Sequence, residues 1–282
     1  MTFKKFFRKI YGNLFNSLNG SGLSKYHVLL KLHVFLSRQL KSEYVDVYGF
    51  KLYLGKNDEG GYSTKNFYKD NYFDFLEKQI HKGDNVVDIG AKIGIYSLAL
   101  SKFVGNLGSV FSFEPTPESF EILRKNKLVN HLDRLVVEQK AVTDKTSIEF
   151  LELCEISGNN RINNNCINGI PVECVSLDDY FSKFTGKISF VKIDVEGFEP
   201  KVLSGMKCLL EKNQEIKILF EYNPKLIKFY GFEPNKLLEN LIDKGFQLFD
   251  LEYDYYIPMN MDHFKDEYDN TRKLTNILAM RT

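Results

Sequence analysis

The stretch of sequence that decides the fold reads Asn85-Val-Val-Asp-Ile-Gly-Ala-Lys-Ile-Gly-Ile-Tyr-Ser97. Its first five residues form an apolar run typical of a buried strand, and Gly90 and Gly94 then permit a tight turn into a helix. The glycine spacing is neither the G-x-G-x-x-G of a dinucleotide site nor part of a phosphate-binding G-K-[ST] loop. Asp88 at the end of the strand also argues against a bound phosphate. A cation, such as a sulfonium or an amino group, suits this carboxylate better.

Strand-like and helix-like segments alternate from residue 84 to the end of the chain. The expected strands are 85–89, 109–114, 135–141, 189–194, 216–221, 246–251 and 274–280, and the expected helices are 95–103, 117–129, 200–212 and 235–244. This alternation predicts βαβ units, and therefore a parallel sheet with helices on both faces. An extra strand is expected at 146–151 and a flexible loop rich in Asn and Gly at 158–169.

Ahead of this α/β domain, the sequence predicts two smaller parts. Residues 44–54 alternate between outward and inward side chains around Gly49, which predicts a short hairpin, and residues 67–80 have helical periodicity. The chain therefore divides into an extension at 1–43, a lead-in at 44–83 and a main domain at 84–282.

The extension differs from the rest of the chain in charge. Residues 1–45 contain eight basic residues and one acidic residue, a net charge of +7, whereas the whole chain of 282 residues has a net charge of +1. Helical spacing places apolar and basic side chains of residues 1–22 on opposite faces, and residues 26–40 predict a second helix. Such a helix suits peripheral contact with a membrane. Packing of its apolar face on the main domain, or on a second copy of the chain, is the alternative.

Composition narrows the class of protein further. Hydrophobic residues make up 43% of the chain and charged residues 27%, which is an ordinary globular balance. The four cysteines form no C-x-x-C pair, which indicates reduced thiols and a cytoplasmic protein. No run reaches the roughly 18 apolar residues that span a bilayer. The acidic body argues against a nucleic-acid partner.

Acidic side chains follow two other expected strands, at the edge where an open α/β sheet binds ligands. Glu114 ends the second strand, where a carboxylate can bind both hydroxyls of a ribose. Another strand leads into Val191-Lys-Ile-Asp-Val-Glu-Gly-Phe-Glu-Pro200, which holds four ionisable residues in eight positions. Lys192 and Asp194 share one face of this strand.

The clustered carboxylates suggest catalysis. Neighbouring carboxylates raise one another's pKa, which suits a general base, and their oxygens also suit a hard cation. A divalent metal on Asp194, Glu196 and Glu221 therefore stays open. The alternative is that Lys192 forms an ion pair with one of the carboxylates and that this pair only supports the turn. Glu199, just before Pro200, is expected to cap a helix.

Together these residues resemble the FkbM family of S-adenosylmethionine-dependent methyltransferases. The similarity runs from residue 45 to residue 281. It rests on Val-Val-Asp-Ile-Gly-Ala-Lys-Ile-Gly-Ile-Tyr-Ser (86–97), Ser-Phe-Glu-Pro-Thr-Pro-Glu (112–118), Val-Ser-Leu-Asp-Asp-Tyr (175–180), Val-Lys-Ile-Asp-Val-Glu-Gly-Phe-Glu (191–199) and Leu-Thr-Asn-Ile-Leu-Ala-Met-Arg (274–281). The family usually has Asn at the position of Lys92.

The resemblance implies a class I, Rossmann-like sheet of seven mostly parallel strands with an antiparallel last strand. It also implies that S-adenosylmethionine is the cofactor. Its methionine part would lie at Asp88, Gly90, Ala91 and Gly94, its ribose at Glu114 and its adenine near Ala141.

The expected reaction is O-methylation of a sugar hydroxyl in a cell-surface glycan or a natural product. We expect Asp194 to act as the general base, Glu196 to bind substrate or share the proton, and Lys192 to orient both. Two other functions stay open. One is a non-catalytic cofactor-binding protein, an alternative favoured by Lys92 in place of the family's usual Asn. The other is an NAD-dependent oxidoreductase, which the absence of a G-x-G-x-x-G motif disfavours.

Overall fold

A computed structural model describes residues 41–55, 62–64, 71–154, 160–163, 166, 168–251, 257–258 and 274–281. The helices expected within residues 1–22 and 26–40 lie outside these described residues, so membrane contact and self-association through them stay predictions. Among the helices that the structure describes, none is long and apolar enough to cross a bilayer.

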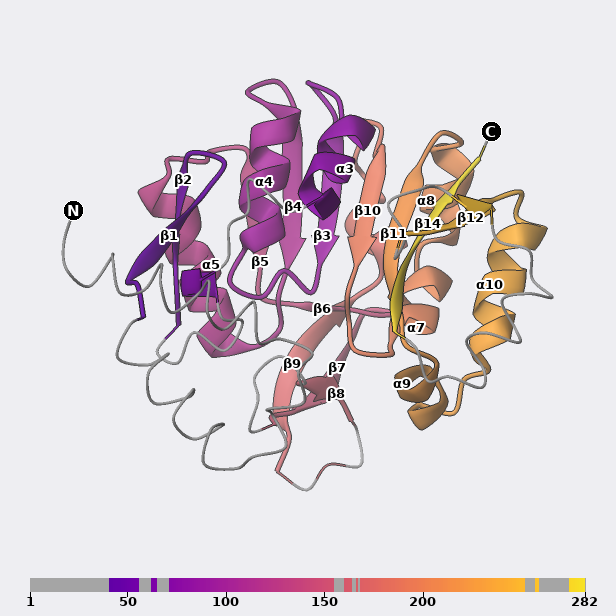
Figure 1. The fold of residues 1–282 in the computed structure, drawn as a ribbon. Helices are drawn as coiled ribbons and strands as arrows, with labels where there is room; N and C mark the ends of the chain where they lie inside the picture. The colour runs from indigo at the N-terminus through magenta and orange to yellow at the C-terminus, as the bar shows by residue number, and fades with distance from the viewer. Residues whose placement is uncertain are drawn as a thin grey trace, which may run out of the picture.

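The main domain is built on one large sheet (Figure 1). Its strand order is β13-β12-β14-β11-β10-β3-β4-β5. The strands are β3 (Asn85–Ile89), β4 (Ser109–Phe113), β5 (Leu135–Glu138), β10 (Phe190–Ile193), β11 (Lys217–Tyr222), β12 (Gln247–Asp250), β13 (Ile257–Pro258) and β14 (Thr275–Met280). The five strands from β5 to β11 are parallel, and β14 runs antiparallel between β11 and β12. All seven predicted strands are therefore present. The two-residue strand β13 pairs with β12 and forms an additional edge of the sheet.

Helices cover both faces of this sheet because side chains along each buried strand alternate between two cores. On one face Val86 packs with the hairpin β1–β2 and with α3 and α4, and α5 joins this layer through β2. On the other face Val87 packs with a second layer. The first layer comprises β1 (Tyr44–Val47), β2 (Phe50–Tyr53), α3 (Asn71–Gln79), α4 (Ile95–Val104) and α5 (Pro117–Val129), and the second α6 (Leu177–Tyr180), α7 (Glu199–Ser204), α8 (Lys207–Lys212) and α10 (Pro234–Asp243).

A smaller sheet lies beyond the carboxyl ends of the parallel strands (Figure 1). Its order is β6-β9-β7-β8, with β6 (Ala141–Val142), β7 (Ser147–Glu152), β8 (Arg161–Ile162) and β9 (Ile170–Val175). Leu151 and Ile162 pack with Phe198 in its own small core. This sheet forms a wall below the edge where the ligand site was expected.

Three sequence expectations need correction. The strand expected at 135–141 ends at Glu138, because Ala141 pairs with Cys174 in the small sheet instead. The loop expected at 158–169 contains β8, because Ile162 is buried against Leu151 and Phe198 and pairs with β7.

The helix expected at 200–212 is two helices. It breaks around Gly205, where a Cβ would overlap the carbonyl oxygen of Thr143. The sequence reasoning also missed the short elements η2 (Tyr62–Thr64), α6 and α9 (Pro224–Phe229).

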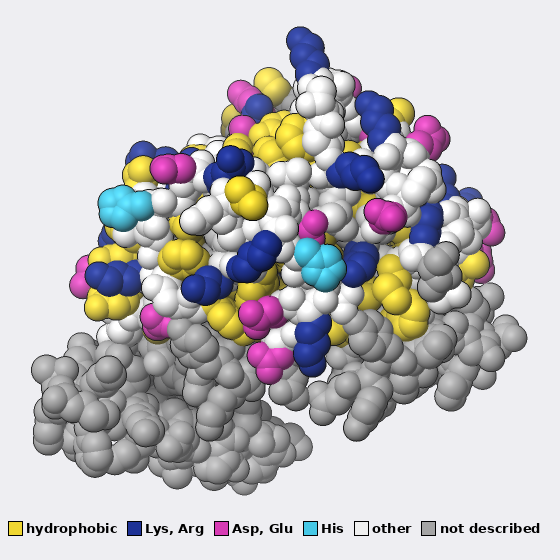
Figure 2. All heavy atoms as spheres, turned by 90° about the horizontal axis from the view of Figure 1, so that it is seen from above, with side chains coloured by type: hydrophobic (Ala, Val, Ile, Leu, Met, Phe, Trp, Pro, Cys, Tyr) yellow, Lys and Arg dark blue, Asp and Glu magenta, His cyan; other side chains and the backbone are white. Residues whose placement is uncertain are grey.

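The opposite end of the molecule, where the parallel strands begin, has a mixed surface. Figure 2 looks onto this end and shows basic, acidic and apolar side chains interspersed. The hollowed surfaces discussed below lie at the other end, between the large and the small sheet.

Candidate functional site

The site lies where β3 and β10 run side by side and their turns meet. The chain leaves β3 through α4 toward β4 on one side, whereas β10 leads through α7 and α8 to β11 on the other. A crevice opens at such a reversal of strand order. Gly90 has a φ of 76°, and a Cβ at this position would overlap the carbonyl oxygen of Asp194. Only glycine therefore lets the two turns approach this closely.

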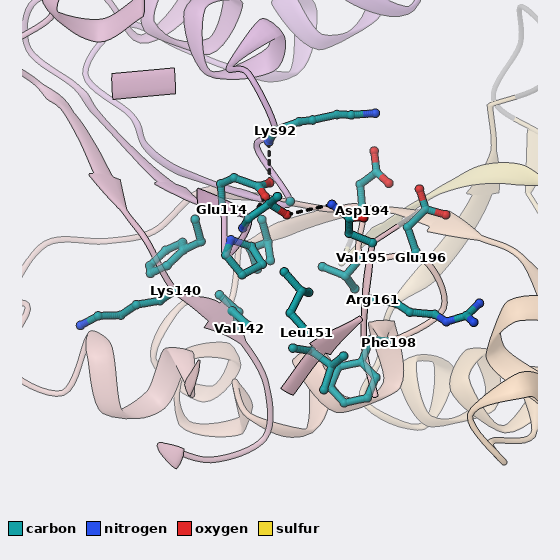
Figure 3. Close-up of a pocket in the computed structure, with 18 residues that line it drawn as sticks. Lys92, Glu114, Lys140, Val142, Leu151, Arg161, Asp194, Val195, Glu196 and Phe198 are labelled. Carbon is teal, nitrogen blue, oxygen red and sulfur yellow. Dashed lines mark hydrogen bonds between the residues drawn. The ribbon is translucent and has the colours of Figure 1, made fainter. Parts of the chain in front are cut away.

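An open cavity of about 730 Å³ occupies this crevice (Figure 3). Strand ends of the large sheet form one wall, and the small sheet and the turn after β10 form the other. The lining residues are apolar Ile89, Phe113, Ala141, Val142, Leu151, Ile162, Val195 and Phe198, with Gly90 and Pro115, and polar Lys92, Glu114, Thr116, Lys140, Asn160, Arg161, Asp194 and Glu196.

Glu114 is held rigidly at the end of β4. Its two carboxylate oxygens accept hydrogen bonds of 2.8 Å from the backbone amides of Lys92 and Thr116 (Figure 3). Burial raises the pKa of this carboxyl group, while the bonds from Thr116 and Lys92 oppose the rise. Each carboxylate oxygen has two lone pairs, so the oxygen bonded to the Lys92 amide retains one for a hydroxyl donor in the cavity.

Lys92 adopts an unusual backbone conformation. Its φ of 53° lies in the left-handed region, which few residues other than glycine adopt, with Asn several-fold enriched. Its backbone amide donates a hydrogen bond to Glu114, and the residue lines the cavity. The left-handed turn gives a physical reason for the Asn that the FkbM resemblance leads one to expect here.

We therefore expect Lys92→Asn to stabilise the fold by about 0.5–1 kcal/mol, because Asn tolerates the left-handed region better. Urea unfolding measures the change. Lys92→Gln is the matched control, because it removes the same charge without that backbone preference. An equal gain in both variants would assign the effect to charge rather than to the backbone.

Asp88 lies behind the cavity, not on its wall. It is fully buried; one of its oxygens accepts a hydrogen bond from Ser97 at 2.7 Å, and the other lies 3.6 Å from the Lys192 ammonium nitrogen. Burial raises the pKa of Asp88, while Lys192 and Ser97 oppose the rise. The cation that suits this carboxylate is thus a side chain of the same chain.

Lys192 links this buried pair to the cavity. Its ammonium donates to Asp194 at 3.2 Å and lies 4.4 Å from the ring centre of Tyr96. Burial opposes the charge of Lys192, but Asp194 and Asp88 outweigh it and raise the pKa of the ammonium. The side chains of Lys192 and Asp194 therefore meet on one side of the strand, as expected.

Glu196 and Glu221 lie near Asp194, and the charge of Lys192 only partly offsets the repulsion among these carboxylates. Burial, with Asp194 adding to it, raises the pKa of Glu196 to about 7 and that of Glu221 to about 8. Glu196 has a φ of 55°, a strained conformation that turns its side chain toward the cavity beside Asp194 (Figure 3). A carboxyl group that titrates near neutral pH is suited to accepting a proton.

Glu199 supports the turn instead of facing the cavity. It is fully buried, and one of its oxygens accepts 3.2 Å hydrogen bonds from the amides of Val195 and Gly197. The expected capping role is wrong: Glu199 is the first residue of α7, Phe198 occupies the N-cap position without a side-chain cap, and the Glu199 carboxylate binds amides of the preceding turn instead. Among the described residues, no group of three Asp, Glu, His or Cys side chains is placed to hold a metal ion.

The structure thus brings together most of the residues singled out from the sequence. Gly90, Glu114, Ala141, Asp194 and Glu196 line one cavity. Ala91 and Gly94 form the turn behind it, joined by a hydrogen bond of 2.8 Å from the Gly94 amide to the Ala91 carbonyl. Sequence reasoning missed the small-sheet wall, whose lining residues include Asn160, Arg161 and Ile162. The only available signal was the Asn-rich segment, which is equally typical of a loop.

A doubly wound sheet with an antiparallel seventh strand, a carboxylate ending its second strand and a cavity at its switch point defines a Rossmann-like methyltransferase domain. The chain belongs to the Methyltransferase FkbM domain family, which matches residues 88–248, more than half of its length. This membership confirms the resemblance seen in the sequence, and the strand order and directions of the large sheet confirm the expected fold class.

Solved structures resemble the fold at low identity. An FkbM methyltransferase from Methylobacillus flagellatus is 17% identical, with a TM-score of 0.44, and the match covers 70% of this chain and 43% of that one. The chain therefore spans less than half the length of that protein. A methyltransferase from Aquifex aeolicus is 14% identical, with a TM-score of 0.44 and coverage of 76% and 90%. A Thermotoga maritima O-methyltransferase is 13% identical, with a TM-score of 0.43 and coverage of 80% and 70%. No curated protein matches the chain.

Proposed function

We propose that this protein is an S-adenosylmethionine-dependent O-methyltransferase that acts on a sugar hydroxyl in a cell-surface glycan or a natural product. The observation that carries the proposal is that Glu114 and the pair Asp194 and Glu196 line the same cavity. The first carboxylate suits a ribose, and the pair suits a weakly acidic hydroxyl.

The residues present fit the cofactor. Phe113, Ala141 and Val142 offer an apolar surface for adenine, and Glu114 offers an acceptor for a ribose hydroxyl. The close approach of the turns at Gly90 leaves backbone groups for the methionine part, and Lys92 offers a cation for its carboxylate. When bound, the cofactor supplies a methyl group on a positively charged sulfur.

The carboxylate pair would handle the proton of the acceptor. A carboxylate of this pair would accept the hydroxyl proton when the acceptor oxygen takes the methyl group that the bound cofactor would supply. We favour Glu196 as the base, because its pKa is raised to about 7, whereas Asp194 already accepts a hydrogen bond from Lys192. Asp194 would then bind and orient the hydroxyl, a division that reverses the expectation from the sequence.

Alignment of the two reactants contributes as well. Holding a hydroxyl in line with the methyl carbon can lower the barrier by about 7–11 kcal/mol, more than general-base help supplies. Asp194 is held between the Lys192 ammonium, which bonds its side chain, and Gly90, which packs against its backbone, so it is suited to this positioning. The family membership removes the oxidoreductase alternative, and a protein that binds the cofactor without turnover stays the competing function.

Calorimetric titration with S-adenosylmethionine tests cofactor binding. We expect saturable binding that Glu114→Gln weakens about 10–100-fold, because hydrogen bonds to a charged group are worth about 1.5–3 kcal/mol. Glu118→Gln is the matched control: it removes the same charge four residues away, on the exposed start of α5. Thermal unfolding of both variants checks that the Glu114 turn persists. Equal affinity in all three proteins would contradict the ribose role.

A further inference from the structure

A second cavity continues the first on the side of the small sheet. It has a volume of about 890 Å³ and lies between the small sheet and α9. Ile162 and Phe198 line both cavities, so these two side chains form the partition. Nothing in the proposed cofactor and acceptor chemistry uses this second space.

Aromatic rings form one wall of the second cavity. The ring of Tyr230 meets those of Phe198 and Phe229 edge to face, with ring centres 5.0 and 5.4 Å apart. Phe229 is 55% exposed, which is unusual for a large apolar side chain that packs against other rings. The guanidinium carbon of Arg161 lies 4.4 Å from the ring centre of Phe229, and Glu152 holds this arginine at 2.9 Å.

Polar groups accompany the rings. Asn163, Lys145, Glu149 and Lys201 also line the cavity, and the charge of Lys201 is paired with Asp144 at 2.7 Å. The Tyr230 hydroxyl is buried and has no hydrogen-bond partner among the described residues. A buried hydroxyl without a partner is costly, so an occupant that hydrogen-bonds it would recover that energy.

The aromatic wall is mechanically tied to the catalytic turn. A Cβ at Gly197 would come within 2.6 Å of the backbone of Leu226 in α9, so the turn that carries Glu196 packs directly on the helix that leads to Tyr230. Phe198 belongs to the same turn. The second cavity is therefore fixed relative to the carboxylates that would activate the acceptor.

We propose that the second cavity is a distal acceptor subsite that holds the neighbouring sugar of an oligosaccharide while Asp194 and Glu196 engage the sugar to be methylated. A sugar ring has an apolar face of C–H groups, which suits an aromatic wall, and a rim of hydroxyls, which suits Asn163 and Tyr230. The mixed charges favour an uncharged sugar. This inference rests on the proposed function and specifies its substrate as an extended glycan.

Methyl transfer to glycosides of increasing length tests the subsite. The probes are methyl glycosides of mono-, di- and trisaccharides of glucose, galactose, mannose and N-acetylglucosamine, assayed with radiolabelled S-adenosylmethionine. We expect kcat/KM to rise at least about tenfold from the monosaccharide to the disaccharide of the accepted sugar. Phe229→Ala should bring this ratio close to one, and Tyr230→Phe should lower it.

The control is Phe150→Ala, because Phe150 is a similarly exposed phenylalanine (43%) outside both cavities. Phe150→Ala should keep the wild-type ratio of kcat/KM between disaccharide and monosaccharide. Because both values come from the same preparation, a partial loss of folded protein lowers both equally and leaves the ratio unchanged. Equal kcat/KM for all lengths, or a ratio that Phe229→Ala leaves intact, would overturn the subsite alone. Cofactor binding without transfer to any glycoside would overturn the proposed sugar acceptor together with this inference.

Discussion

Lys192→Met should lower the free energy of unfolding by about 3–5 kcal/mol, the cost of leaving a buried charge without its partner. Asp88 has no exposed surface, and Lys192 is its counter-ion at 3.6 Å. The register of the sheet makes this pair unavoidable, because Lys192 on β10 lies beside Asp88 on β3, and Asp88 lies beside Ser112 on β4. Urea unfolding measures the loss.

The loss should depend on pH in a defined direction. Without the ammonium, the already raised pKa of Asp88 rises further in the folded state, so the folded protein holds a proton that the unfolded chain releases. The variant therefore regains stability as pH falls and loses it as pH rises through the folded-state pKa of Asp88. Asp88→Asn combined with Lys192→Met should recover much of the loss, because no charge is then left buried.

Lys201→Met provides the matched control. Lys201 also pairs with a carboxylate, Asp144 at 2.7 Å, but its side chain is 35% exposed and that of Asp144 is 26% exposed. An ion pair in contact with water contributes only about 0–1 kcal/mol. If the two lysine variants lost equal stability, the buried pair would not be the strong electrostatic contact inferred here.

The contrast between Asp88 and Glu114 shows how far sequence reasoning reaches. Strand periodicity and turn glycines located both residues at strand ends, and the large sheet follows from the same signals. Which carboxylate faces a ligand depends on the side chains opposite, and these come from distant segments. Lys192 follows Asp88 by more than a hundred residues and converts an expected ligand contact into an internal ion pair.

The small-sheet wall escaped prediction for a related reason. Its strand β8 has two residues, too few for any periodic signal, and it forms because Ile162 finds a buried place against Leu151 and Phe198. Tertiary contacts, not local propensity, decide such a segment. The same contacts line both cavities, so the sequence could indicate Asp194, Glu196 and the strand near 146–151 but not the wall that β8 completes.

Glu196→Gln should lower kcat about 10²–10⁴-fold, the usual contribution of a general base, with little change in the affinity for S-adenosylmethionine. The base must be deprotonated to act, and the pKa of Glu196 is raised to about 7 by burial and by Asp194. Wild-type turnover should therefore be low in acid, rise with pH through about 7 and then level off. The rise should vanish in Glu196→Gln, because its amide does not titrate.

Asp194→Asn separates the two carboxylates. If Asp194 binds and orients the hydroxyl, Asp194→Asn should also lower kcat yet keep a rise of turnover with pH, which Glu196 still provides. Glu211→Gln, an equal charge change on exposed α8, should alter neither the rate nor its pH profile. Loss of the rise in Asp194→Asn and its survival in Glu196→Gln would make Asp194 the base. Lys192 would then hold one oxygen of that base by its hydrogen bond and leave the other oxygen for the substrate proton, while its positive charge would lower the basicity of the carboxylate.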